Sequence, residues 1–399
     1  MNVIGIVAEY NPFHKGHALH LRQSRAALGE EAPVVCVLSG DFVQRGEPAV
    51  FSKHARARLA VAGGVELVLE LPLPWCLLSA EGFARGAVAL LDSLGAVTHL
   101  SFGSEAGELA PLSAVARAAR EPGVIQAVRE AQQAGLPYAA ARQQVLTERL
   151  GPVASCLGEP NNILGVEYLK ALYSLNSGIA PITVPRALSA HDGRGGALPS
   201  ALEARERLRQ GLSAEELLPA GALSVAAEEI KAGRGPVFGA ALENALVSRL
   251  RFLPEEAFSS LPDATEGLGA RLYRAVRAEP GAEEILAAVK TKRYPLSRLR
   301  RMALCAALGI DKTVAAQAAP PYARVLAANA RGRELLRRLR GTTRVPLLTK
   351  PASVRELSED ANRVFRITAE ARDLYVLAFG ARQERRGGSD WRAGPYMGE

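Results

Sequence analysis

The chain has 399 residues, of which 48% are hydrophobic and 23% charged, as expected for a globular protein with two or three domains. No apolar run is long enough to cross a bilayer and the N-terminus does not resemble a signal peptide, so we expect no membrane association. Four scattered cysteines without metal-ligand spacing exclude a disulfide scaffold and indicate a reducing, cytoplasmic location.

The first stretch, residues 3–21, reads V-I-G-I-V-A-E-Y-N-P-F-H-K-G-H-A-L-H-L. Its β-branched start predicts a buried parallel strand, Asn11-Pro12 ends that strand, and a helical pattern follows. A helix N-terminus at the end of a strand favours an anion through its free N–H groups and its dipole. His14 and His17 add two donors there, and Gly16 lets a phosphate approach the backbone. One alternative, a zinc pair, lacks convincing cysteine or carboxylate partners nearby; the other is that the two histidines are incidental.

The H-x-G-H spacing directly after a strand resembles the motif of the nucleotidyltransferase superfamily, which includes adenylyltransferases and class I aminoacyl-tRNA synthetases. The resemblance implies that His14 and His17 stabilise the transition state in which a nucleophile attacks the α-phosphate of ATP and pyrophosphate leaves. This chemistry suits the residues, because it needs positioned donors and cations around developing charge rather than a covalent nucleophile.

Strands and helices alternate along the first half of the chain. Four more strands are predicted: in A-P-V-V-C-V-L-S-G-D, ending at Ser39-Gly40, and at Val65–Leu71, Val97–Phe102 and Ala180–Pro185. Ser52 and Ser79 are predicted to cap helices between them. This order predicts an α/β fold with a Rossmann-like, doubly wound parallel sheet, followed by a mainly helical domain. In such sheets, ligands bind at the carboxyl ends of the strands.

The chain changes character after residue 205. Asp192–Pro199 is a glycine-rich loop, Ser200 starts a helix, and a mostly helical pattern then runs to about Phe379. We therefore predict a nucleotide-binding catalytic domain over residues 1–205 and a helical domain over residues 206–381. Residues 382–399 are polar and glycine-bearing and are predicted to be a flexible tail.

Positive charge is concentrated in residues 287–350, where lysines and arginines face only two acids, Asp311 and Glu334. Such a cluster is typical of a polyanion site, although charges on a helix are often only a solvated face. Arginines there are predicted to follow a tRNA backbone, and Tyr294 to stack on an unpaired base. The candidate tRNA-binding residues are Lys292, Arg293, Tyr294, Arg298, Arg300 and Arg301.

Several longer motifs occur in order: E-Y-N-P-F-H-K-G-H, S-G-D-F-V-Q-R-G-E-P-A, F-G-S-E, E-P-N-N-I-L-G-V-E-Y and K-R-Y-P-L-S-R-L-R-R. Together they resemble the bacterial tRNA(Met) cytidine acetate ligase family. The resemblance implies that acetate attacks ATP to give acetyl-adenylate and pyrophosphate. The N4 amine of the wobble cytidine of elongator tRNA(Met) then takes the acetyl group, giving N4-acetylcytidine without acetyl-CoA.

The same resemblance implies which residues contact ATP. His14 and His17 are the catalytic pair at the phosphates. The implied ATP-binding residues are Val7, Glu9, Asn11, His14, Gly16, His17, His20, Gly103, Asn161 and Arg186. Plain structural roles stay open for several of them: a turn glycine at Gly103, a helix cap at Asn161 or Asn162, and a surface cation at Arg186.

Further candidates lie beside this set. Ser200 and Arg205 stand where related adenylyltransferases carry a phosphate motif, but Leu202 replaces its central hydroxyl residue. Asp41, Gln44 and Arg45, after the second strand, are candidates for contact with acetate or tRNA. Lys53 and Arg56 share a helix face and are candidates to extend a phosphate path.

The sequence thus predicts an ATP-dependent, adenylate-forming ligase acting on tRNA, with Mg²⁺ accompanying ATP and no metal site formed by protein residues. One alternative is a small-molecule adenylyltransferase of the same fold, which leaves the basic helical domain unexplained. Another is a non-enzymatic, nucleotide-sensing RNA-binding protein, which leaves the paired histidines without a role. The preference for acetate, the identity of the tRNA and the oligomeric state do not follow from the residues.

Overall fold

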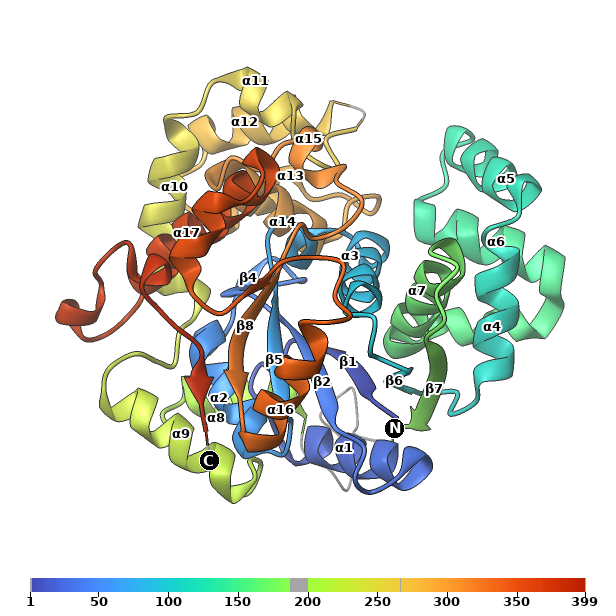
Figure 1. The fold of residues 1–399 in the computed structure, drawn as a ribbon. Helices are drawn as coiled ribbons and strands as arrows, with labels where there is room; N and C mark the ends of the chain where they lie inside the picture. Colours follow the sequence, from blue (N-terminus) through green and yellow to red (C-terminus); the bar gives the residue numbers. More distant parts are fainter. Residues whose placement is uncertain (1, 187–199, 266, 399) are drawn as a thin grey trace.

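The computed structural model describes residues 2–186, 200–265 and 267–398, and its centre is a mixed sheet with the strand order β10-β8-β5-β2-β1-β6-β7 (Figure 1). The five predicted strands are present and pair in parallel, which confirms the predicted α/β fold. Their bounds are β1 Ile4–Ala8, β2 Val34–Ser39, β5 Leu67–Leu71, β6 His99–Ser104 and β7 Ala180–Pro185. The predicted loop Asp192–Pro199 lies outside the described residues.

The direction of strand addition reverses beside β1. Strands β2 and β5 are added on one side of β1, and β6 and β7 on the other. Two connections therefore leave the sheet in opposite directions at the carboxyl ends of β1 and β6, which is where a doubly wound sheet forms its ligand crevice.

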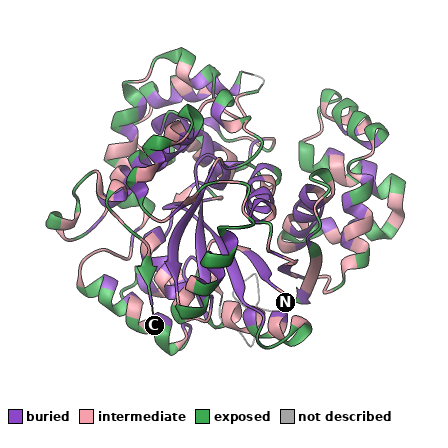
Figure 2. Ribbon diagram, in the orientation of Figure 1, coloured by how far each residue is buried: buried purple, intermediate pink, exposed green. Residues whose placement is uncertain are grey.

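Successive residues of β2 face opposite sides of the sheet, as the pleat of a strand requires. Val35 and Val37 join one apolar core, whereas Val34, Cys36 and Leu38 join the other. Figure 2 shows the resulting contrast between buried strands and outer helices with exposed faces. Both faces are covered by helices, which explains why residues 34–38 of β2 are all apolar rather than alternating with polar residues.

Helices of the first half cover both faces of the sheet. Leu21 of α1 and Leu59 of α2 belong to one core, and Leu91 of α3 and Leu169 of α7 to the other. Ser52 and Ser79 cap α2 and α3 through their side chains, as predicted. The bounds are α1 Lys15–Leu28, α2 Lys53–Ala62, α3 Ala80–Ser93, α4 Leu109–Ala118, α5 Pro122–Gln133, α6 Tyr138–Leu150 and α7 Pro160–Ser174.

The second half is mostly helical, as predicted, and much of it lies beyond one end of the sheet (Figure 1). Its helices are α8 Ala201–Arg209, α9 Ala220–Lys231, α10 Glu243–Arg251, α11 Glu255–Ser259, α12 Leu268–Ala278, α13 Ala282–Val289, α14 Leu296–Ala307, α15 Lys312–Ala315, α16 Ala330–Leu339 and α17 Glu359–Val376. Among the described residues, no helix is both long and apolar enough to span a membrane.

This half also holds strands that were not predicted, and the expectation of a flexible tail is wrong. The region expected to be helical contributes β8 (Ala323–Ala328), which pairs antiparallel with β5, and the short β9 (Leu347–Leu348), which pairs with β8. The expected flexible tail forms two short helical turns and β10 (Tyr396–Met397), which pairs with β8. The C-terminal segment is therefore part of the sheet domain.

A buried ionic network holds this last segment in place. Asp390 is fully buried and lies 2.6 Å from Lys53 Nζ and 2.7 Å from Arg324 Nη1. Glu70, also fully buried, accepts from the same two cations at 2.6 and 3.1 Å. The two positive charges balance the two carboxylate charges. One neutral cluster therefore joins the C-terminal segment to α2, β5 and β8.

Candidate active site

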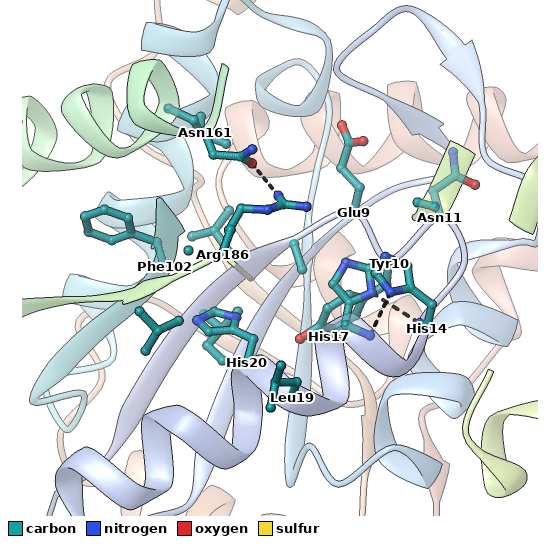
Figure 3. Close-up of a pocket in the computed structure, with 18 of the residues that line it drawn as sticks. Glu9, Tyr10, Asn11, His14, His17, Leu19, His20, Phe102, Asn161 and Arg186 are labelled. Carbon is teal, nitrogen blue, oxygen red and sulfur yellow. Dashed lines mark hydrogen bonds between the residues drawn. The ribbon is translucent and has the colours of Figure 1, made fainter. Parts of the chain in front are cut away.

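A cavity of about 250 Å³ lies where β1, β6, β7 and the start of α1 meet (Figure 3). Every residue predicted to contact ATP lines it: Val7, Glu9, Asn11, His14, Gly16, His17, His20, Gly103, Asn161 and Arg186. These residues come from segments far apart in the chain, and the reversal of strand order beside β1 brings them together.

His14 and His17 form a reciprocal cap at the start of α1. His14 Nδ1 accepts from the Gly16 N–H at 3.0 Å, and His17 Nδ1 accepts from the His14 N–H at 3.2 Å. The imidazole rings stack with their centroids 3.8 Å apart. Because both Nδ1 atoms accept, each neutral ring carries its proton on Nε2. The motif therefore provides two oriented Nε2–H donors in the cavity lining.

The cavity histidines are neutral at physiological pH. Burial, with added repulsion from Arg186 and Arg205, lowers the pKa of His14 to about 4. Burial and Arg186 likewise lower the pKa of His20 to about 4, and burial with repulsion from His14 places the pKa of His17 well below its usual value. A triphosphate entering beside these rings would meet neutral donors and two arginine cations.

These pKa shifts predict how stability depends on pH. Between about pH 6.5 and pH 4, these histidines are protonated in the unfolded chain but neutral in the folded protein. The unfolded chain therefore binds more protons, so the free energy of unfolding should fall as the pH falls. Replacing His20 with glutamine should reduce that slope by at most about 1.4 kcal/mol per pH unit. Urea denaturation without ATP at several pH values measures it, and identical slopes for both proteins would contradict the assignment.

Asn161 and Arg186 are held together on the opposite side of the cavity. Arg186 Nη1 donates to Asn161 Oδ1 at 2.6 Å, and Asn161 Nδ2 donates to Glu105 Oε1 at 2.5 Å. Glu105 also accepts from the Asn162 N–H at 2.9 Å, near the N-terminus of α7. Glu105, the acid of the F-G-S-E motif, therefore orients the amide group of Asn161 towards Arg186.

The structure distinguishes between the alternative roles suggested for these residues. Asn161 lines the cavity, whereas Asn162 is buried and accepts from the Ala106 N–H at 3.0 Å. Neither is the cap residue of α7, whose capping position is Glu159. At Gly103, a Cβ atom would lie 3.0 Å from Arg186 Cγ, so the glycine makes room for the arginine stem.

Glu9 is the acid of the cavity lining, and it faces several cations. Glu9 Oε1 accepts from the Gln44 N–H at 2.8 Å. Burial raises the pKa of Glu9, against the opposing effects of that hydrogen bond and of Arg56, Arg45 and Arg205. Arg205 Nη1 donates to the Asn11 carbonyl at 2.8 Å and lines the same cavity.

Other predicted site residues lie elsewhere. Ser200 caps α8 by accepting from the Glu203 N–H at 3.1 Å, and it is not part of the cavity lining. Asp41 is buried and accepts from the Lys53 N–H at 2.7 Å and from Arg372 at 3.3 Å. Its burial argues against the suggested contact with tRNA, and the alternative contact with acetate stays a prediction. Arg45 is exposed and Gln44 is half-buried.

The phosphate path suggested for Lys53 and Arg56 is also wrong, because both side chains are fully buried. Lys53 belongs to the ionic network described above. Arg56 donates to the carbonyl groups of Glu9, Ser39 and Gly40, at the ends of β1 and β2. It thus fixes the loops that carry the cavity residues, a role that the sequence reasoning missed.

The basic cluster does not form one patch. Arg301 and Tyr294 are buried, and this burial argues against the predicted stacking of Tyr294 on a base. Arg298 donates to the Asp263 carbonyl at 2.7 Å, and Arg300 pairs with Glu47. Lys292 is exposed and Arg293 half-buried. In Figure 1, α16, which carries many of the other arginines, lies at the opposite end of β8 from α14.

Sequence reasoning also missed the apolar part of the cavity. Phe102 and Tyr168 line it with ring centroids 5.7 Å apart, next to Leu164 and Leu19. Phe102 ends a predicted strand directly before Gly103, so its position at a carboxyl end was the available signal. Tyr168 lies in α7, whose packing against β6 could not be read from the sequence.

Known proteins resemble this chain over its whole length. The family model of the HIGH nucleotidyl transferases matches residues 1–390. The tRNA(Met) cytidine acetate ligase of Acetivibrio thermocellus is 33% identical over 98% of both chains. The protein of the same name from Syntrophotalea carbinolica is 40% identical over 88% of this chain and 85% of its own.

A solved structure resembles the fold closely. Thermotoga maritima TmcAL bound with alpha-thio ATP has a TM-score of 0.92 and 31% identity, covering 100% of this chain and 99% of that one. Its apo form has a TM-score of 0.93 and 32% identity over the full length of both chains. This chain belongs to the HIGH nucleotidyl transferase family and, within it, to the tRNA(Met) cytidine acetate ligases.

Proposed function

We propose that this chain is an ATP-dependent ligase that activates acetate as acetyl-adenylate and acetylates N4 of the wobble cytidine of elongator tRNA(Met). The observation that carries the proposal is the cavity beside β1. It collects all the residues that the family motifs assign to ATP, with two neutral histidines presenting Nε2–H donors. The names of the relatives support the choice of acetate and tRNA(Met).

In the first step, an acetate oxygen attacks the α-phosphorus of ATP, and the bond to the pyrophosphate oxygen breaks. His14 and His17 donate hydrogen bonds to oxygens on which negative charge develops, and Arg186 and Arg205 neutralise the phosphates. The site also includes Glu9, Asn161 and Gly103 in its lining, and Asn161 holds Arg186 in position by a hydrogen bond.

In the second step, the N4 amine attacks the acetyl carbonyl carbon. AMP leaves with the electron pair of the broken C–O bond, and N4 loses one proton. The acetyl group thus comes from acetate and ATP, and acetyl-CoA takes no part.

Mg²⁺ belongs to this proposal as part of the substrate MgATP. The described residues contain no cluster of three histidine, cysteine or carboxylate groups arranged to hold a metal ion. The phosphates of ATP would therefore supply the main ligands of the ion, as is usual for Mg²⁺ bound with nucleotides.

We further propose that the part of the chain after residue 205 contacts tRNA, with Lys292, Arg293, Arg298 and Arg300 on that surface. Of these residues, Arg300 lies beside the hairpin of β3 (Phe42–Val43) and β4 (Glu47–Pro48), since it pairs with Glu47. A cytoplasmic location follows from substrates of this kind.

Mass spectrometry of nucleosides tests the function directly. Purified protein is incubated with MgATP, isotopically labelled acetate and unmodified tRNA(Met). We expect labelled N4-acetylcytidine that depends on ATP. Acetate-dependent pyrophosphate without a labelled nucleoside would show that the acceptor is wrong. The absence of both would refute the proposed activity and favour a small-molecule adenylyltransferase.

A further inference from the structure

A second cavity, of about 520 Å³, adjoins the first. Its walls come from the β3–β4 hairpin, α8, residues 237–240 with Leu242, α10, α13, α14 and α17. Its volume lies in the range of roughly 300–1,000 Å³ that is usual for pockets holding small organic groups. None of the family motifs used above assigns a ligand to most of this lining.

Arg205 lines both cavities and so marks their junction. Carboxylates from both cavities act on its charge. Burial lowers the pKa of Arg205, whereas Glu47 in the second cavity and Glu9 in the first both act to raise it. A group seated in the second cavity can therefore contact the same arginine side chain as a group seated in the first.

The hairpin wall is fixed against α14. A Cβ atom at Gly46 would lie 2.6 Å from the Arg301 backbone nitrogen and 2.7 Å from Arg300 Cβ, and Gly46 has a φ of +75°. Only glycine fits this approach without displacing backbone. The neighbouring ion pair between Glu47 and Arg300 reinforces the contact. The cavity thus has a defined wall at the hairpin, next to the exposed cation Arg45.

The lining suits a nucleoside better than a phosphate chain. Acids and bases are both present: Glu47, Glu243, Glu283 and Glu284 against Arg205, Arg209 and Arg300. The rest is largely apolar, with the Arg209 guanidinium 4.8 Å from the centroid of the Phe238 ring. An aromatic ring with a stacked arginine is a usual seat for an unpaired base. Carboxylates accept hydrogen bonds from the N4 amine of cytosine, which is a donor.

We propose that this second cavity receives the acceptor cytidine of the tRNA, splayed out of its loop, and that its N4 amine reaches the acetyl-adenylate past Arg205. This inference rests on the proposed function. It divides the reaction between two cavities, so that damage to the second should spare acetate activation and impair transfer.

Ala240 and Ala241 give a matched pair for the test. Both are exposed in the same short helical turn, η3 (Gly239–Leu242), but only Ala240 lines the cavity. In Ala240→Trp, an indole ring should fill the cavity mouth, whereas Ala241→Trp should leave it open. Two rates are measured for the full-length proteins: acetate-dependent exchange of pyrophosphate with ATP, and formation of N4-acetylcytidine in tRNA.

We expect Ala240→Trp to keep the exchange rate within about twofold of wild type and to lose roughly tenfold or more in transfer, the loss that one base stack can account for. Ala241→Trp should keep both rates. Equal transfer by the two variants overturns the proposal, and so does a parallel loss of exchange in Ala240→Trp. A wild-type protein without acetate-dependent exchange instead refutes the proposed function.

A second measurement does not depend on how the tryptophan variant folds. Ala240→Cys and Ala241→Cys are labelled with a maleimide, and labelling is quantified on the peptide that contains each new cysteine. Unmodified tRNA(Met) should slow labelling at position 240 more than at position 241. A tRNA with uridine at the acceptor position should protect position 240 less. Equal labelling at both positions in every case overturns the proposal.

Discussion

Replacing His14 with alanine is expected to lower the rate of acetate-dependent pyrophosphate release by roughly 10²–10³-fold, the usual cost of losing one donor to a developing charge. The structure gives the reason: His14 Nδ1 is occupied by the Gly16 N–H, so its Nε2–H is the group left to face a phosphate. The rate is measured as release of pyrophosphate at saturating ATP and acetate.

The alanine variant alone does not separate catalysis from folding. His14 is also the capping residue of α1, and loss of a cap costs about 1 kcal/mol of stability. His14→Asn is therefore the informative companion, because the asparagine side chain is a good cap and still accepts from the Gly16 N–H. It has no donor at the position of Nε2. We expect His14→Asn to regain stability but not activity.

His99→Asn serves as the matched control. His99 lies at the start of β6, outside the cavity lining, and its Nδ1 contacts Thr98 Oγ1 at 2.8 Å. It should keep the wild-type rate. If His14→Asn restores both stability and pyrophosphate release, then His14 acts through the helix cap alone, and its catalytic assignment is wrong.

The parallel sheet and the cavity beside β1 could be predicted because local signals and topology agree there. The strands of the first half are rich in apolar residues and end near Pro, Gly or Asn, so their carboxyl ends could be located. The family resemblance grouped residues as distant as Glu9 and Arg186, and the rule that ligands bind at those ends agrees with that grouping. Gly103 was placed correctly in the lining, but its neighbour is the stem of Arg186, which only coordinates reveal.

The surface of the basic half was harder to predict than the sheet, because the sequence does not tell which acid lies beside a given arginine or lysine. Arg300 meets Glu47 from the β3–β4 hairpin, and Arg344 meets Asp92 from the end of α3. These partners are more than two hundred residues away. Similarly, β8 reads A-R-V-L-A-A, a composition with high helix propensity, and becomes a strand because β5 offers it an edge to pair with.

Replacing Asp390 with asparagine is expected to destabilise the protein by about 3–5 kcal/mol, the cost of breaking a buried ion pair from one side. The change leaves Lys53 and Arg324, both buried, with Glu70 as their remaining carboxylate partner among the described residues. His54, which contacts Asp390 Oδ1 at 3.1 Å, does not add a charge at neutral pH, because burial lowers its pKa. Urea denaturation at pH 7 measures the difference in the free energy of unfolding.

Burial by itself would raise the pKa of Asp390, but Lys53 and Arg324 together hold it well below its usual range. A lowered folded-state pKa stabilises the protein above the unfolded value near 3.9, and this stabilisation is lost as the pH falls below it. The difference in the free energy of unfolding between wild type and Asp390→Asn should therefore be fully present at pH 7 and shrink only in acid.

Glu384→Gln, in the same segment but at a partly exposed position, is the control and should unfold like wild type. A flexible C-terminal tail would make the two variants equally stable. A large loss in Asp390→Asn alone would mean that the last residues of the chain help to hold α2 and, through Arg56, the loops that carry Glu9 and the nucleotide cavity.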